Sequence, residues 1–218
     1  HARMAAKGGM PGIAIVCGPP NMAPFGAKAA GLQNSPISIA VQGKDLGPLI
    51  LDMATSVAAG GKVQLAVDKG VPIPVGWALD KDGNSTTDPN KYATLLPFGG
   101  PKGSGLSLMF ECLSSLMVGN PLLQPTLEGK EDAPRGVQNS VVAAIDIGTF
   151  TNVEEYKEHV DGVIEGLKSL PKADGVDESF VPGEPEDRVY QDRIKNGIPL
   201  PEGTIENLRY VANRLEVD

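Results

Sequence analysis

The sequence predicts a mixed α/β fold in which strands and helices do not alternate regularly. Two observations support this prediction. Short β-branched and apolar runs lie between glycines and prolines, and three longer stretches repeat apolar residues at helical spacing. Hydrophobic residues make up 41% of the 218 residues and charged residues 21%, which is typical of a globular chain. A chain of this length fits one or two domains.

Five short apolar runs are the predicted strands, and most of them are continuous rather than alternating. We therefore expect both faces of these strands to be buried. The dipeptide Asp82-Gly83 is a tight-turn signal and predicts a hairpin. The predicted strands cover 13–16, 37–41, 49–53, 75–79 and 141–147.

Three stretches predict helices with one apolar face: 103–118, 153–168, and a last one that Thr204 would cap. The opening stretch HARMAAKGGMPG is typical of the last turns of a helix, which suggests missing upstream sequence. The polar stretches 119–139 and 171–187 are predicted as long surface loops.

The composition argues against several classes of function. A formal net charge of -8 disfavours a nucleic-acid-binding surface, because phosphate contacts need clustered Lys and Arg. No apolar run reaches the roughly 18 residues of a membrane-spanning helix. Cys17 and Cys112 stand apart, so we expect two buried thiols in a reducing, cytoplasmic compartment rather than a disulfide or zinc site. The two histidines, His1 and His159, are too few for a His-based metal site, and His159 is expected on the surface.

The stretch LLPFGGPKGSG, residues 95–105, is a candidate anion site. Glycines let backbone N–H groups approach a ligand, and the start of a helix attracts negative charge. Lys102 adds a full positive charge. The stretch is neither a Walker A motif nor a GxGxxG motif. The alternative interpretation is a glycine turn that carries a solvated lysine.

Two acidic stretches are further candidates. In LILDMATS, Asp52 ends an apolar strand, where a carboxylate needs hydrogen-bond partners and can orient a substrate or bind a cofactor hydroxyl. The alternative for Asp52 is a helix N-cap. In FVPGEPEDR, Gly183 and Glu184 stand between prolines, and a carboxylate on a stiff loop can bind ribose hydroxyls. The alternative for Glu184 is a solvated acidic loop.

Seven stretches together resemble the type-2 malate/L-lactate dehydrogenase family, which is distinct from the Rossmann-type lactate and malate dehydrogenases. They occur in the family's order and cover nearly the whole chain, and LDMATS combined with LLPFGGPKGSGL is highly specific. The stretches are MAAKGGMPGIAIV, MAPFG, NSPISIAV, LILDMATS, GWALDKDGNSTTDP, LLPFGGPKGSGLSLMFECL and FVPGEPEDRVYQDRIKNGIPLP.

The resemblance implies an α/β (mixed α+β) fold with a large central mixed sheet flanked by helices, and a cofactor domain that is not a Rossmann fold. Residues 1–150 would form the main part of this domain, and helical segments in 151–218 would complete the subunit. The implied activity is hydride transfer between NAD or NADP and C2 of a small 2-hydroxy or 2-oxo acid, such as malate or lactate. A homodimer is also implied.

The resemblance assigns cofactor contacts to individual residues. Gly18 stands where relatives can carry a cofactor-contacting serine, and Ser35 replaces the asparagine usual in the family's G-T-N-P turn. Lys62 is the candidate for contact with the 2′-phosphate of NADP. The residues that match cofactor contacts are Gly18, Asp52, Met53, Ala54, Lys102, Pro182, Gly183 and Glu184.

The family's catalytic histidine lies upstream, in an N-terminal helical portion of roughly a hundred residues that also supplies an arginine for the substrate carboxylate. Neither His1 nor His159 matches its motif, so we expect this sequence to be a fragment of an enzyme in which that histidine exchanges the hydroxyl proton. Asp52 is the catalytic candidate within the sequence. The alternatives are an inactive dinucleotide-binding protein on the same scaffold and an unrelated anion-binding α/β domain.

Overall fold

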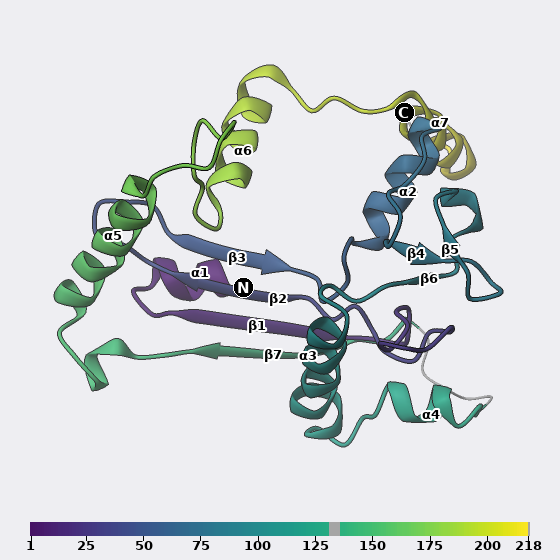
Figure 1. Ribbon diagram of the computed structural model, residues 1–218, viewed down its shortest axis with the longest axis horizontal. Helices are drawn as coiled ribbons and strands as arrows, with labels where there is room; N and C mark the ends of the chain where they lie inside the picture. Colours follow the sequence, from purple (N-terminus) through teal and green to yellow (C-terminus); the bar gives the residue numbers. More distant parts are fainter. Residues whose placement is uncertain (131–135, 218) are drawn as a thin grey trace. The chain divides into compact units, whose positions relative to one another are not determined.

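The chain passes back and forth between two units, each assembled from segments far apart in the sequence. The structure is a computed structural model that describes residues 1–130 and 136–217. The first unit comprises His1–Val16, Pro36–Met53 and Asn139–Asn196, and the second comprises the described parts of Cys17–Ser35, Ala54–Gln138 and Gly197–Asp218. Figure 1 labels their helices and strands, and the predicted mixture of both is confirmed. Within these ranges, no helix has the length and apolarity that a membrane crossing requires.

A four-stranded sheet, ordered β3-β2-β1-β7, is the centre of the first unit. Isoleucine and valine recur in its strands, and their branched side chains favour extended backbone. β2 pairs antiparallel with β1 and with β3, and the second register sets Ser38 opposite Asp52. The elements of this unit are α1 (Ala2–Lys7), β1 (Gly12–Cys17), β2 (Ile37–Val41), β3 (Leu49–Met53), β7 (Asn139–Ala144), η3 (Ile147–Thr149), α5 (Val153–Ser169) and α6 (Glu184–Asn196).

The opening helix α1 confirms the sequence prediction and packs on the sheet through small residues. Ala2 and Ala6 are buried against Ala40 of β2. Gly12 permits this close packing, because a Cβ at that position would overlap the carbonyl oxygen of Ala2.

The prediction that the strands are buried on both faces is wrong for the two edge strands. Leu51 of β3 is 37% exposed and Val142 of β7 is 58% exposed. A continuous apolar run shows that a strand favours burial, but it does not show which element covers each face.

The second unit contains a three-stranded antiparallel sheet, ordered β5-β4-β6. Trp77 and Tyr92 pack against its core, which consists of Met22, Leu32, Val63, Ala66, Ile73, Ala78, Leu95 and Leu123. The elements are α2 (Gly60–Lys69), β4 (Ala78–Leu79), β5 (Ser85–Thr86), η1 (Pro89–Lys91), β6 (Thr94–Leu95), α3 (Pro101–Glu111), the π-helix η2 (Cys112–Leu116), α4 (Leu123–Leu127) and α7 (Glu202–Leu215).

The predicted hairpin at Asp82-Gly83 is confirmed by the pairing of β4 with β5. Gly83 has φ +77°, and Oδ1 of Asp80 accepts hydrogen bonds from the amides of Asp82 at 3.0 Å and Asn84 at 2.9 Å. The strand predicted over 75–79 is present only in its last two residues, because the proline-rich stretch before it forms a turn.

The last predicted strand, 141–147, is shifted toward the N-terminus and becomes β7. It ends at Ala144, since Asp146 caps the short helix η3 by accepting a hydrogen bond of 2.9 Å from the amide of Gly148. This cap outweighs the β propensity of Ile145 and Ile147.

The helix predicted over 103–118 is present as α3 and η2, but most of its predicted apolar face is exposed, and of that face only Phe110 is buried. Met109 and Leu113 are 55% and 49% exposed, whereas Ser107 and Glu111 are buried. Small and polar inner residues let this helix approach neighbouring loops closely. The apolar periodicity therefore identified the helix but not its packed side. The helix predicted over 153–168 is confirmed as α5.

The last helix, α7, begins before its predicted cap. Its N-cap is Pro201, and Thr204 lies inside the first turn, so the predicted Thr204 cap is wrong. The Thr204 hydroxyl donates a hydrogen bond of 2.8 Å to Oδ2 of Asp68 and thereby fixes α7 on α2.

Both stretches predicted as long loops contain a helix. α4 lies within 119–139, of which residues 131–135 are outside the described ranges, and α6 begins at Glu184 within 171–187. Pro185 suggested a loop, yet proline is tolerated in the first turn, where a helix makes no use of the missing donor.

Candidate functional site

A pocket in the first unit lies where the segment 180–187 meets the edge strand β3. The amide of Ile50 donates a hydrogen bond of 2.9 Å to the carbonyl of Pro182, so the segment pairs with the strand. Gly183 has φ +98°, and a Cβ there would lie only 3.2 Å from the amide nitrogen of Ile50. The Pro-Gly-Glu sequence therefore needs its glycine for a close backbone approach.

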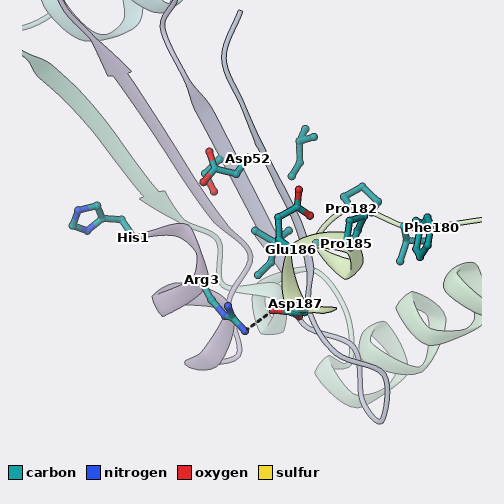
Figure 2. A pocket seen from close by; sticks show the side chains of 13 residues that line it. His1, Arg3, Asp52, Phe180, Pro182, Pro185, Glu186 and Asp187 are labelled. Atoms are coloured by element: carbon teal, nitrogen blue, oxygen red, sulfur yellow. Dashed lines mark hydrogen bonds and ion pairs between the residues drawn. The ribbon is translucent and has the colours of Figure 1, made fainter. Parts of the chain in front are cut away.

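The pocket combines an apolar wall with acidic groups (Figure 2). Its volume of about 550 Å³ is in the range of small-molecule sites. Arg3 of α1 forms an ion pair of 3.4 Å with Asp187 of α6, which Figure 2 marks with a dashed line. The pocket is lined by His1, Arg3, Ser38, Ile50, Leu51, Asp52, Phe180, Val181, Pro182, Gly183, Pro185, Glu186 and Asp187.

Asp52 presents an open carboxylate to this pocket. It is exposed, and within the described part of the chain its carboxylate has no hydrogen-bond or ion-pair partner. The alternative of a helix N-cap is wrong, because α2 begins at Gly60 with Ala59 as its N-cap. The carboxylate is therefore available to a ligand.

Glu184, by contrast, has a carboxylate that is already paired. Nζ of Lys168 lies 2.7 and 2.9 Å from its two oxygens, and the amide of Val181 donates a hydrogen bond of 3.0 Å to Oε2. The Lys168 ammonium holds the pKa of the Glu184 carboxyl below its usual value, and Glu184 in turn raises the pKa of Lys168. Glu184 begins α6 and anchors the pocket segment to α5, and its predicted cofactor contact stays a prediction.

In the second unit, Thr55 of LILDMATS is hydrogen-bonded to both the NSPISIAV and the LLPFGGPKGSGL stretches. Its amide donates a hydrogen bond of 3.2 Å to the carbonyl of Asn34, and its carbonyl accepts one of 3.0 Å from the amide of Phe98. Gly103 packs directly on it, since a Cβ there would overlap the Thr55 carbonyl oxygen. The backbone that follows Ala54 is thereby fixed to the glycine loop.

Lys102 lies exposed in the first turn of α3, after Gly99 and Gly100, whose φ angles are +54° and +60°. The sequence predicts free amides at this helix start, but they are paired. The amide of Gly103 donates to the carbonyl of Phe98 at 2.9 Å, and that of Lys102 donates to Gly99 at 3.3 Å. These two amides are therefore not available to the predicted cradle, and the Lys102 ammonium remains as the anion-attracting group. Anion binding at this loop stays a prediction.

The MAPFG loop docks on the same helix start. The amide of Phe25 donates a hydrogen bond of 3.1 Å to Oγ of Ser104, and a Cβ on Gly100 would lie 3.0 Å from the Phe25 ring. The ring is nevertheless 64% exposed, so it offers a flat apolar surface beside the lysine-bearing loop. Nothing in the spacing of the sequence indicated this residue.

The remaining predicted residues take different positions. Gly18 is buried, yet an added Cβ would come no closer than 3.6 Å to its neighbours, so the backbone leaves room for a serine. Ser35 donates its hydroxyl to Sγ of Cys17 at 3.4 Å. Lys62 is exposed in the first turn of α2, and His159 is exposed on α5, as expected.

Several pocket residues were missed because their role depends on pairing in three dimensions. Ser38 is recognised as a neighbour of Asp52 only once the β2–β3 register is known, and Arg3 stands in a helix whose sequence carries no chemical signal. Lys168, which pairs with Glu184 but does not line this pocket, was missed for the same reason. In the described ranges, no three His, Cys, Asp or Glu side chains gather as metal ligands.

Comparison with known proteins connects this geometry to a family. The family model described as malate/L-lactate dehydrogenase matches residues 1–209. The chain belongs to the malate/L-lactate dehydrogenase family. This confirms the resemblance read from LDMATS and LLPFGGPKGSGL.

Individual members of the malate/L-lactate dehydrogenase family are similar over almost the whole chain. The L-sulfolactate dehydrogenase of Methanocaldococcus jannaschii is 37% identical and covers 99% of this chain. The solved malate dehydrogenase of Pyrococcus horikoshii is 33% identical, covers 100% of the chain and has a TM-score of 0.81. The (2R)-3-sulfolactate dehydrogenase (NADP(+)) of Chromohalobacter salexigens is 31% identical and covers 96% of the chain.

The chain spans less than the full length of these relatives. It covers 62% of the two sulfolactate dehydrogenases and 61% of the malate dehydrogenase structure. The names of the relatives also differ in substrate, so family membership does not select one hydroxy acid.

Proposed function

We propose that this chain carries the cofactor-binding part of an NAD(P)-dependent oxidoreductase. The enzyme would transfer a hydride between the nicotinamide and C2 of a small 2-hydroxy or 2-oxo acid of the malate or lactate type. The observation that carries the proposal is the pocket at β3, in which the open Asp52 carboxylate stands beside an apolar wall. Membership in a family of dehydrogenases supports it.

The residues present fit a dinucleotide. The apolar wall at Phe180 and Pro182 suits a base, and the Asp52 carboxylate can accept hydrogen bonds from ribose hydroxyls. The Lys102 ammonium suits a phosphate oxygen. When bound, the nicotinamide supplies the hydride chemistry, and the protein positions it and excludes water. The residues proposed to hold it are Gly18, Asp52, Met53, Ala54, Lys102, Pro182, Gly183 and Glu184.

We assign the proton exchange at the substrate hydroxyl to a histidine outside this sequence. Of the two described histidines, His1 lines the pocket but does not match the family's motif, and His159 is exposed on α5 and is not among the lining residues. The open carboxylate of Asp52 also makes it a catalytic candidate, as the alternative to its binding a ribose. An active homodimer located in the cytoplasm belongs to the same proposal.

A catalytically inactive dinucleotide-binding protein is the second candidate, because neither His1, which lines the pocket, nor His159 matches the motif of the family's catalytic histidine. The two candidates differ in turnover. Oxidation of NADH or NADPH by the full-length protein in the presence of 2-oxo acids supports the dehydrogenase. Dinucleotide binding without turnover supports the inactive binder.

The test is a fluorescence titration of the purified protein with NADH and NADPH, comparing the unmodified protein, Lys102→Ala and the surface control Lys195→Ala. Loss of a charge-assisted contact of about 1.5–3 kcal/mol should weaken binding by Lys102→Ala about tenfold or more. Lys195→Ala should bind normally, since Lys195 is exposed at the end of α6. No binding of either dinucleotide to the unmodified protein would refute the proposal, and an unchanged affinity in Lys102→Ala would remove Lys102 from the site.

A further inference from the structure

We propose that the pocket at β3 accepts the adenosine ribose of the cofactor only without a 2′-phosphate, so that the enzyme uses NAD in preference to NADP. This inference rests on the proposed function and deepens it. Family membership does not decide the question, because one relative is named for NADP(+).

The charges that line the pocket are the first argument. Asp52, Glu186 and Asp187 are acidic, and the basic side chains among the lining residues are those of Arg3 and His1. Lys62, the sequence candidate for contact with the 2′-phosphate, is not a lining residue. Arg3 is already paired with Asp187 at 3.4 Å. Within the described ranges, Asp52 and Glu186 have no cationic partner, so the pocket retains unpaired negative charge.

A 2′-phosphate is poorly matched to such a pocket. It carries between one and two negative charges and normally binds to an unpaired Arg or Lys with hydrogen-bond donors. Here it would have to approach carboxylates or displace Asp187 from Arg3. Like charges that come together in a partly enclosed site raise the free energy of binding.

A free ribose diol is well matched. Asp52 and Ser38 stand opposite each other on β3 and β2, so a carboxylate and a hydroxyl line the same side of the pocket. Carboxylate oxygens accept hydrogen bonds from both hydroxyls of a diol, and a phosphate on one hydroxyl removes a donor while adding charge. Figure 2 shows Glu186 beside Pro182 and Pro185, with Asp52 on the neighbouring strand.

The experiment distinguishes binding of the adenosine end in this pocket from binding of the whole cofactor. Isothermal titration with 5′-AMP and with adenosine 2′,5′-bisphosphate tests the adenosine end alone, and titration with NADH and NADPH tests the whole ligand. We compare the unmodified protein with Asp52→Asn, Glu186→Gln and the control Glu206→Gln, whose side chain is exposed on α7. Circular dichroism establishes that each variant is folded.

We expect the unmodified protein to bind NADH at least about tenfold more tightly than NADPH at low salt, which equals about 1.4 kcal/mol. Glu186→Gln should tighten NADPH binding several-fold and change NADH binding much less, whereas Asp52→Asn should weaken NADH binding. The preference for NADH over NADPH should become smaller in high salt, because salt screens the repulsion between the 2′-phosphate and the carboxylates. Glu206→Gln should change none of these values.

Different failures refute different statements. NADPH binding that equals or exceeds NADH binding overturns the inference and leaves the proposed function in place. A preference for NADH that neither Asp52→Asn nor Glu186→Gln reduces also overturns it, because the selectivity then arises elsewhere. If the folded protein binds neither dinucleotide, both the proposed function and this inference fail.

Discussion

The amide of Phe98 donates a hydrogen bond of 3.0 Å to the carbonyl of Thr55, and this bond joins the two most specific stretches of the sequence. Thr55 belongs to LDMATS and Phe98 to LLPFGGPKGSGL. Gly103 completes the junction by packing on both backbones. Ala54 and Lys102, each next to a member of this junction, therefore take their positions from one shared backbone arrangement.

Gly103→Ala should destabilise the second unit strongly. Its Cβ would overlap the carbonyl oxygen of Thr55 and lie 2.7 Å from that of Phe98, and backbone atoms cannot move aside cheaply. We expect a loss of about 2–3 kcal/mol in the free energy of unfolding, measured by urea denaturation.

Gly105→Ala is the matched control for Gly103→Ala in the same helix. A Cβ at Gly105 meets nothing within 4 Å, and alanine is the better helix former by about 1 kcal/mol. Gly105→Ala should leave the free energy of unfolding unchanged or raise it. Equal effects of the two substitutions would show that Gly103 is not kept for close packing.

The ion pair between Lys168 and Glu184 predicts a pH-dependent contribution to stability. Because its folded pKa is depressed, Glu184 stabilises the protein above its unfolded pKa of about 4.3, and the contribution is lost as the pH falls through the lower folded value. Urea denaturation should give Glu184→Gln a deficit of up to about 1 kcal/mol at pH 7, as for partly exposed pairs, and a smaller deficit below about pH 4.

Two further variants make this prediction specific. Lys168→Met should remove the same contribution, and adding Glu184→Gln to it should cost little more, because the coupling is already gone. Glu206, which has no ion-pair partner among the described residues, is the control, and Glu206→Gln should show no comparable pH dependence. A Glu184→Gln deficit that stays constant down to pH 3 would contradict an electrostatic origin.

Much of the fold was predictable because local signals agree with it. The strands at Ile37–Val41 and Leu49–Met53 have the predicted bounds, and helical periodicity located α3 and α5. The face of each helix that packs against the core was not predictable from the same signals. The apolar face of α3, with Met109 more than half exposed, shows that periodicity reports a helix without reporting what covers it.

The site was predictable only in part, for a physical reason. Asp52, Pro182 and Gly183 come together in one pocket because β3 pairs with the segment around Pro182. Those residues stand in recognisable sequence motifs. The sequence could not show that Lys168 pairs with the Glu184 carboxylate, or that the amides of Lys102 and Gly103 are hydrogen-bonded within the protein. Such pairings depend on contacts between distant segments, which no local pattern encodes.

Asp161 is predicted to hold the β2–β3 connection in place. Its carboxylate accepts hydrogen bonds from the amides of Lys44 at 3.2 Å, Asp45 at 2.7 Å and Leu46 at 3.3 Å. Asp161→Ala should cost about 1–2 kcal/mol in the free energy of unfolding, since water can reach part of this region. Hydrogen exchange at these three amides should accelerate.

The control for Asp161→Ala is Glu165→Ala, one turn further along α5. Glu165 is exposed and its side chain has no partner among the described residues, so exchange at residues 44–46 should stay as in the unmodified protein. If Asp161→Ala leaves exchange in this loop unchanged, the carboxylate does not organise the connection.

The two cysteines should differ sharply in reactivity. Cys17 is fully buried, and burial raises the pKa of its thiol, which lowers the fraction of the nucleophilic thiolate. Cys112 is only half-buried at the start of η2, so the prediction of two buried thiols is wrong for Cys112. Mass spectrometry after iodoacetamide treatment of the native protein should find Cys112 labelled at least about a hundredfold faster than Cys17, because Cys17 must wait for an opening of the structure.

In urea both thiols should react at similar rates, and native Cys112→Ser should be almost unlabelled. Rapid native labelling of Cys17 in that variant would show that the buried packing around Ser35 opens far more readily than its burial implies.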